Sequence, residues 1–155
     1  DVTSMIPSSL TVASVLVVLV SACASEGTAP AARPSVGIWN QGANLRDSVN
    51  KQTHIHTGYF SFSQAGNGFT GTGEQSGFCH GANGDYVGPL AEGTPFKVTD
   101  GVQQGDRVSF KTDLCSYEGA LSEDHDHMNG TVRCAYIDNG VSFVWQGDWL
   151  ANRER

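Results

Sequence analysis

Apolar and polar residues alternate with a period of two along most of the chain after Val36. In the stretch VSFKTDL, Val108, Phe110, Thr112 and Leu114 fall on one face, and polar side chains separate them. Successive side chains of a β-strand point to opposite sides, so this alternation is typical of a strand with one buried face. The pattern therefore predicts a strand over residues 108–114.

The stretch TVRCAYIDNGVSFVWQGDWL predicts a β-hairpin. Asn139-Gly140 is a dipeptide that readily adopts the two positive φ angles of a two-residue hairpin turn. Pairing of Asp138 with Val141 then fixes the register of both strands. This register places three pairs on one face of the sheet: Tyr136 with Phe143, Cys134 with Trp145 and Val132 with Gly147.

Similar signals recur along the chain, and no stretch after Val36 has a convincing helical period with caps. GYFSFSQAGNGFTGTGEQSGF predicts a hairpin around Gly66-Asn67-Gly68, and TPFKVTDG predicts a short strand that ends at Asp100-Gly101. We count seven or eight short antiparallel strands. The expected fold is all-β, a small up-and-down antiparallel barrel with a sandwich as the alternative, and a signal peptide and short linker precede it.

Gly37-Ile38-Trp39, at the start of the first expected strand, resembles the Gly-x-Trp motif of lipocalins, and GIWNQ is similar to the opening strand of avidin-type barrels. The lipocalin resemblance implies that a basic residue after the last strand packs over this Trp, a role that Arg153 could take. Alternatively, Trp39 plugs one end of an unrelated β-domain. A small barrel is filled by side chains or holds one small ligand. The candidate pocket residues are Trp39, Phe60, Phe62, Phe110, Tyr136, Phe143 and Trp145.

The N-terminal region predicts export. Residues 10–20, LTVASVLVVLV, are apolar, but as a helix they would reach only about 16 Å, roughly half the hydrocarbon thickness of a bilayer. They are typical of the hydrophobic region of a signal peptide. Val20, Ser21 and Ala22 before Cys23 resemble the bacterial lipobox, which implies lipidation of Cys23. We expect a signal peptide over 1–22, a lipidated Cys and flexible linker over 23–35, and a barrel domain over 36–155.

Two other interpretations of the N-terminal region remain open: ordinary cleavage near Ala22 to Ala24, which would release a soluble protein, and an uncleaved anchor. In the lipoprotein interpretation the domain is anchored in a membrane of the bacterial cell envelope, on the periplasmic or surface side, because more than one buried acyl chain gives stable anchoring.

Composition narrows the function classes. The 155 residues suffice for one domain. The net charge is −7, and the nine Lys and Arg residues are not clustered, which argues against nucleic acid as a partner. The sequence contains no Gly-x-Ser-x-Gly, no phosphate-binding glycine loop and no His-Glu-x-x-His motif. We therefore expect a binding or structural protein rather than an enzyme.

Three cysteines follow Cys23, and an exported chain meets an oxidising environment, so we expect one disulfide and one free thiol. Cys115 and Cys134 flank SEDHDHMNG, and a hairpin register that pairs them also sets Gly119 against Gly130. We favour this pair, with Cys79–Cys115 as the alternative.

Histidine pairs suggest a metal site. His54 and His56 share one face of an expected strand, and His125 and His127 could do the same beside Asp124 and Asp126. Such a set would suit Zn²⁺ or Cu²⁺. Alternatively, the second pair belongs to a solvated hairpin loop that needs no ligand. If the strand through Gly58 is straight, His54 and His56 point inward, whereas a bulge there would turn them outward.

Three functions are compatible with the sequence. The leading one is a membrane-tethered barrel that binds a small apolar or amphipathic molecule. The second is a metal-binding surface lipoprotein, and the third is a structural or interaction domain without a ligand. The first predicts a cavity lined by aromatic residues, the second predicts converging histidines, and the third predicts a filled barrel.

Overall fold

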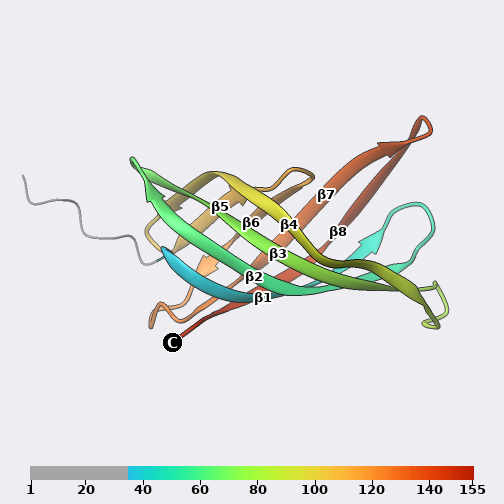
Figure 1. The fold of residues 1–155 in the computed structure, drawn as a ribbon, viewed down its shortest axis with the longest axis horizontal. Coiled ribbons are helices and arrows are strands. Elements are labelled where there is room, and N and C mark those ends of the chain that lie inside the picture. Colours follow the sequence, from blue (N-terminus) through green and yellow to red (C-terminus); the bar gives the residue numbers. More distant parts are fainter. Residues whose placement is uncertain (1–34) are drawn as a thin grey trace, which may run out of the picture. The chain divides into compact units, whose positions relative to one another are not determined.

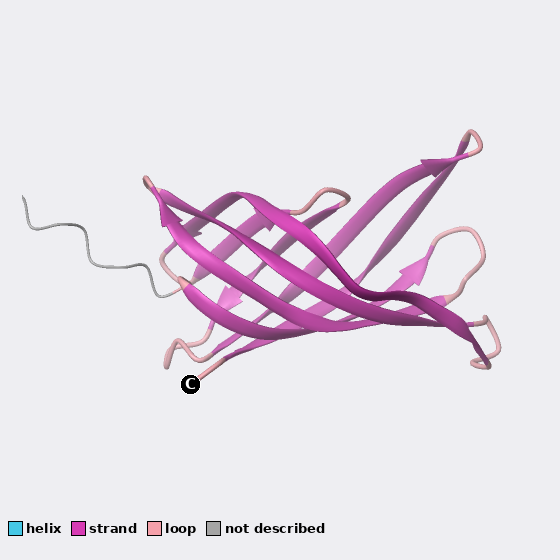
Figure 2. Ribbon diagram, viewed as in Figure 1, coloured by secondary structure: helices cyan, strands magenta, loops and turns pink. Residues whose placement is uncertain are grey.

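The computed structural model describes residues 35–155. The predicted signal peptide, Cys23 and nearly all of the predicted linker lie outside the described residues. Within residues 35–155 all regular structure is strand (Figure 2), and no helix of this region is long and apolar enough to cross a membrane.

Eight antiparallel strands form a closed barrel in which each strand pairs with its neighbours in sequence and β1 pairs with β8 (Figure 1). The predicted fold class is therefore confirmed. The strands are β1 (Gly37–Asp47), β2 (Thr53–Ala65), β3 (Gly68–His80), β4 (Tyr86–Gln104), β5 (Arg107–Lys111), β6 (Cys115–Leu121), β7 (His127–Asp138) and β8 (Val141–Arg153).

The hairpin registers follow the turn chemistry. Asn139 and Gly140 have φ angles of 48° and 80°, and the strands pair as predicted, from Asp138 opposite Val141 to Val132 opposite Gly147. Ala65 pairs with Gly68, which confirms the hairpin at that position. Two short loops that demand positive φ angles thus fix the alignment of four strands.

Two predicted strand boundaries are wrong. β4 continues past Asp100-Gly101 to Gln104. Asp100 takes a φ of 54° and the register with β5 shifts between Thr99 and Val102, so the dipeptide forms a β-bulge inside the strand and does not end it. β5 ends at Lys111, and the chain turns there so that Leu114 is exposed rather than buried. A positive φ angle can therefore occur inside a strand, and alternation alone does not identify the last paired residue.

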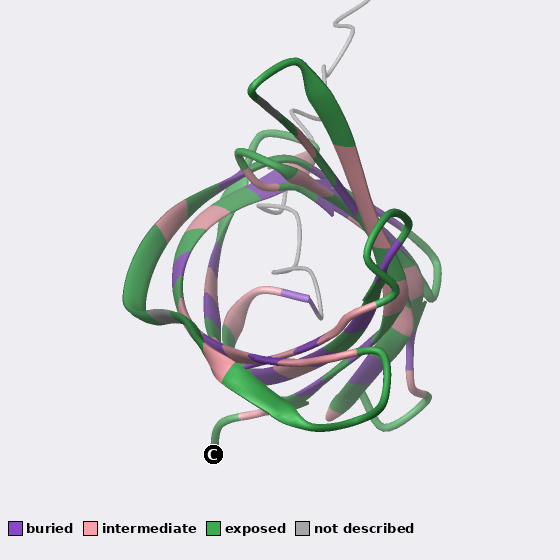
Figure 3. Cartoon of the chain, turned by 90° about the vertical axis from the view of Figure 1, so that its right-hand side faces the viewer, coloured by how far each residue is buried: buried purple, intermediate pink, exposed green. Residues whose placement is uncertain are grey.

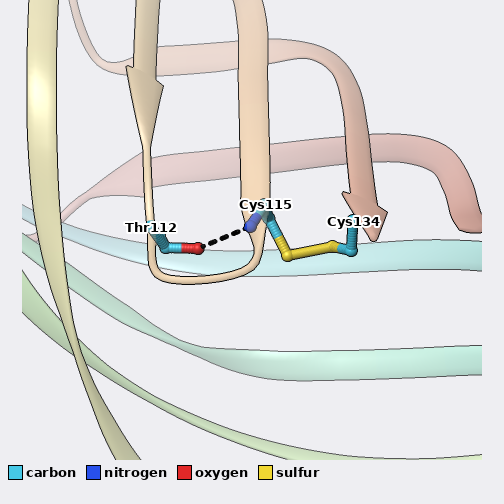
Figure 4. The surroundings of a disulfide bond; sticks show 3 residues. All are labelled: Thr112, Cys115 and Cys134. Carbon is cyan, nitrogen blue, oxygen red and sulfur yellow. Dashed lines mark hydrogen bonds between the residues drawn. A yellow bond between two sulfur atoms is a disulfide. The ribbon is translucent and has the colours of Figure 1, made fainter. Parts of the chain in front are cut away.

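The predicted disulfide between Cys115 and Cys134 is confirmed (Figure 4). The two cysteines face each other across β6 and β7, in the register that also pairs Gly119 with Gly130. The hydroxyl of Thr112, in the turn before β6, accepts a hydrogen bond from the Cys115 N–H at 3.3 Å. The disulfide therefore links the start of β6, just after the β5–β6 turn, to β7.

Aromatic side chains fill one end of the barrel, which we call the Trp39 end and which includes the β2–β3, β4–β5 and β6–β7 loops. Phe60 lies at its centre, with ring centroids of Phe62, Phe110, Tyr117 and Trp149 between 5.1 and 6.2 Å away. Seen along the barrel, buried and exposed residues alternate around the wall (Figure 3). Large rings at the inward positions leave little free space in a barrel this narrow.

Arg153 closes the Trp39 end. Its guanidinium carbon lies 4.3 Å from the centre of the Trp39 ring, as the lipocalin resemblance implies, and its nitrogens donate to the carbonyls of Val36 and His125. Trp39 is fully buried, and its Nε1–H donates to the Ser35 carbonyl at 2.8 Å. These contacts close the barrel at the place where β1 begins and β8 ends.

Candidate functional site

The candidate site lies at the opposite end of the barrel, which we call the His54 end and which includes the β1–β2, β3–β4 and β7–β8 loops. β2 and β3 pair without a shift from Thr53 to Ala65, so no bulge occurs at Gly58. His54 and His56 therefore point into the barrel, and both are buried. Opposite His56, a Cβ at Gly77 would lie 2.9 Å from its Nδ1, so the glycine makes room for the imidazole.

A cavity of about 170 Å³ lies between His56 and the aromatic core, and His54 is not part of its lining. Tyr117 belongs to both the core and the cavity wall, and burial raises the pKa of its hydroxyl, which therefore stays protonated. The wall is mostly apolar and draws on strands all around the barrel. Its lining includes Ala43, Leu45, His56, Phe96, Tyr117, Cys134, Tyr136 and Trp145.

The cavity reaches the surface because two strands are short. β5 and β6 have 5 and 7 residues, whereas β4 and β7 have 19 and 12. The first half of β4 pairs with β3 but extends beyond β5, and the last residues of β7 extend beyond β6. The exposed residues Thr94, Pro95, Asp113 and Leu114 line the cavity at this place, where a ligand can enter.

Five buried nitrogens at this end have no hydrogen-bond partner among the described residues: both ring nitrogens of His54, both of His56 and Nε1 of Trp145. The His54 ring lies edge-on to Trp145, with centroids 3.8 Å apart, and 6.4 Å from the His56 ring. Buried polar groups are nearly always paired, since an unpaired one costs about 1–3 kcal/mol. Because His56 and Trp145 line the cavity, these two side chains are equipped to bind a polar group or water that enters it.

Both imidazoles are neutral at pH 7. Burial lowers the pKa of His56 from 6.5 to about 4, and the neighbouring His54 adds to this effect. Burial also lowers the pKa of His54, although the Asp47 carboxylate opposes the shift. Each neutral ring offers one donor and one acceptor, and the Trp145 indole offers one donor. The site can thus both donate to a ligand and accept from it.

Asp47 and Cys79 flank the His54 side of the site. The buried Asp47 carboxylate accepts hydrogen bonds from the N–H groups of Val49 and Asn50, so it is held by the β1–β2 loop. Cys79 pairs with His54 in the register of β2 and β3, and its thiol is free and buried. Burial raises the pKa of this thiol, and Asp47 adds to the shift, so the sulfur is a poor nucleophile at neutral pH.

The seven predicted pocket residues divide between the two ends. Tyr136 and Trp145 line the cavity. Phe143 is half-buried further along the β7–β8 hairpin and stacks on Tyr136 with centroids 5.0 Å apart. The other four belong to the packed core of the Trp39 end: Trp39, Phe60, Phe62 and Phe110.

The predicted metal ligands also fall at opposite ends. His54 and His56 lie at the His54 end, whereas His125 and His127 lie on the exposed β6–β7 loop at the Trp39 end. Among residues 35–155, no group of three or more His, Cys, Asp or Glu side chains is placed to hold a metal ion. The structure does not assemble the two pairs into one site.

The β6–β7 loop uses its polar residues to hold its own shape. Asp124 accepts from the Ser122 hydroxyl and the Asp126 N–H, and the Ser122 bond lowers the pKa of the Asp124 carboxyl. Asp126 forms ion pairs with Arg153 and Arg155 at 3.8 and 2.6 Å. These interactions account for the acidic residues of the loop without a metal ion: they hold the shape of an exposed loop at the Trp39 end.

Several site residues were not identified from the sequence. Ala43, Leu45 and Tyr117 occupy inward positions of alternating strands, so the period-two pattern that marked the core contains them. Asp113 lies in the β5–β6 turn, and no periodicity indicates which way a turn residue faces. The unpaired state of His54 and His56 depends on what surrounds them in space, which the sequence does not reveal.

Comparison with known proteins adds little. No protein-family model and no curated protein matches this chain. Among solved structures, the S-type phycobiliprotein lyase CPES from Guillardia theta superimposes with a TM-score of 0.45 at 10% sequence identity, over 79% of this chain and 89% of that chain. A likeness at that level carries no argument, so the function has to be inferred from the residues of the site.

Proposed function

We propose that the barrel binds one small amphipathic molecule in the cavity at the His54 end. The observation that carries this proposal is the combination of an apolar cavity with three unpartnered nitrogens in its wall, two on His56 and one on Trp145, while the unpartnered His54 ring lies against Trp145. A barrel that only had to be stable would fill this space with apolar side chains, because an unfilled cavity and an unpaired polar atom both reduce stability.

The size and polarity of the cavity define the ligand class. An engineered protein cavity of about 150 Å³ binds benzene, so about 170 Å³ accommodates one ring-sized apolar body. The neutral imidazoles and the indole N–H match an uncharged polar group that both donates and accepts, such as a hydroxyl. A larger molecule could leave its remainder outside, beyond Thr94 and Leu114, where the cavity opens.

A cavity-filling substitution tests the proposal. In Ala43→Leu the larger side chain occupies the cavity, and we expect binding of p-cresol, measured by isothermal titration calorimetry, to be lost or weakened at least about tenfold. Ala120→Leu makes the same change at an exposed position of β6 and serves as the control. The parent should also bind p-cresol more tightly than toluene, which lacks the hydroxyl.

Unchanged p-cresol affinity in a folded Ala43→Leu variant would place the ligand elsewhere. Failure of the parent chain to bind either compound would favour a structural or interaction domain without a ligand.

We further infer that the chain is exported and anchored to a membrane of the cell envelope through a lipidated Cys23. Support comes from the apolar run at residues 10–20, the small residues before Cys23, and a disulfide that an oxidising compartment would preserve. Cys23→Ser should move the protein from the membrane fraction to the soluble fraction and remove the acyl mass. Membrane association of the variant equal to that of the parent would contradict lipidation at this residue.

A further inference from the structure

The charge at the cavity opening suggests which molecules the barrel selects. Among the described residues that line the cavity, Asp113 is the one acidic residue, and no Lys or Arg shares the lining with it. Asp113 is exposed in the turn between β5 and β6, where the cavity opens. A ligand bound in the cavity therefore meets a negative charge at the entrance.

The buried end of the cavity is also unfavourable for an anion. His56 and Trp145 could donate hydrogen bonds to a carboxylate, but the imidazole is neutral, and burial opposes the proton uptake that would compensate the negative charge. The Asp47 carboxylate adds a negative charge close enough to act on His54. A carboxylate would thus lose its hydration without gaining a cation, and an unpaired buried charge is costly.

A positive group is favoured at the opening for the opposite reasons. An ammonium can pair with Asp113, and the chain's net charge of −7 attracts cations. Aromatic rings share the cavity lining with Asp113: Tyr136 and Trp145 have ring centroids 5.3 Å apart. The faces of such rings attract cations at close range.

On the basis of the proposed function, we infer that the cavity selects small amines: molecules with a ring-sized apolar body, an uncharged polar group directed at His56 and Trp145, and a protonated amine at the opening beside Asp113. The neutral His56 ring favours an uncharged polar group at the buried end of the ligand. The Asp113 carboxylate favours a positive group at the outer end. Selection against carboxylates is part of the same inference.

Three probes with the same phenol ring and different side-chain charge test the inference: tyramine, 4-hydroxyphenethyl alcohol and 4-hydroxyphenylacetate. Their affinities for the full chain would be measured by isothermal titration calorimetry at neutral pH and low salt. We expect tyramine to bind roughly two- to fivefold more tightly than the neutral alcohol, as for a partly exposed charge pair. The acid should bind more weakly than the alcohol, and added salt should reduce both differences.

Asp113→Asn should remove the preference for tyramine over the alcohol, and the fold should tolerate the change because the side chain is exposed. Asp106→Asn, a matched exposed residue in the β4–β5 turn at the Trp39 end, should leave the preference intact. Equal or tighter binding of the acid, or an unchanged preference in Asp113→Asn, would overturn the inference while leaving the proposed cavity function intact. Failure of all three probes to bind would count against the proposed function itself.

Discussion

The burial of His56 makes the stability of the barrel depend on pH. The pKa of this imidazole is 6.5 in an unperturbed chain and about 4 in the folded barrel. Between these values the unfolded chain binds more protons than the folded one, so stability falls as the pH is lowered from about 6.5 towards 4. A pKa difference of this size corresponds to about 3 kcal/mol.

Urea unfolding between pH 7.5 and pH 4.5 measures this dependence. His56→Gln removes the titrating group, and we expect a clearly smaller loss of stability on acidification, with His54 supplying the remainder. His127→Gln, at an exposed position of the Trp39 end, should behave like the parent. Identical pH profiles for His56→Gln and the parent would show that the imidazole is not buried as described.

A second prediction at the residue scale concerns Arg153. It packs over Trp39, donates to two carbonyls and pairs with Asp126, so its removal should expose the Trp39 end to water. We expect Arg153→Ala to lower the free energy of unfolding by about 2 kcal/mol. Arg153→Lys should recover only part of this, because an ammonium lacks the planar donor geometry.

The control for Arg153 is its neighbour. Arg155 also pairs with Asp126, but its side chain is 83% exposed, so Arg155→Ala should change the denaturant midpoint little. Equal effects at the two positions would mean that the contact between Arg153 and Trp39 contributes nothing to stability.

At the scale of the elements, turns and cross-strand pairs were predictable where local chemistry determines them. Asn139-Gly140 predicted the β7–β8 register, and the hairpin register around residues 115–134 favoured the pairing of Cys115 with Cys134 over Cys79 with Cys115. Prediction failed at Asp100, where a positive φ angle marks a bulge inside β4 rather than its end. Such a difference depends on whether the neighbouring strand continues to pair, which is a tertiary property.

The candidate site shows a similar division between local and tertiary information. If β2 is straight, alternation places His54, His56, Phe60 and Phe62 on the inner face. β2 is straight, and these four side chains are buried. The sequence did not show that the rings near Phe60 would fill one end of the barrel and leave space near Trp145. The opening of that space also depends on the shortness of β5 and β6, and the boundaries of an element are the least predictable part of a sequence.

The disulfide should be the main covalent contribution to the stability of the β5–β7 region. Cys115 and Cys134 are 19 positions apart, and closing a loop of this length stabilises a protein by about 3 kcal/mol in the chain-entropy model. Reductant should therefore lower the urea midpoint of the parent. Cys79→Ser should retain this sensitivity because Cys79 is a free thiol, whereas Cys115→Ala/Cys134→Ala should lose it.

If the Cys79→Ser variant were insensitive to reductant, the pairing would have to involve Cys79, which was the alternative considered from the sequence.

At the scale of the whole barrel, the two ends differ in how they are packed. The Trp39 end is packed with rings and sealed by Arg153, whereas the His54 end keeps a cavity with polar atoms that no described residue satisfies. The buried rings are concentrated at one end, and the cavity lies toward the other. This division is the basis of the proposed ligand-binding function.

The indole N–H groups of the three tryptophans differ between the two ends of the barrel. The Nε1–H groups of Trp39 and Trp149 donate to the carbonyls of Ser35 and Glu118. The Nε1–H of Trp145 lies at the cavity and has no partner among the described residues. A ligand with a polar group in the cavity should therefore change the environment of one indole and leave the other two nearly unchanged.

The measurement that tests the central claim most directly is a ¹⁵N–¹H correlation spectrum of the indole N–H groups during titration with p-cresol. The Trp145 signal, assigned with a Trp145→Phe variant, should move saturably, and the signals of Trp39 and Trp149 should stay in place. Saturation without movement of the Trp145 signal, or no saturable change in any signal, would contradict binding in this cavity.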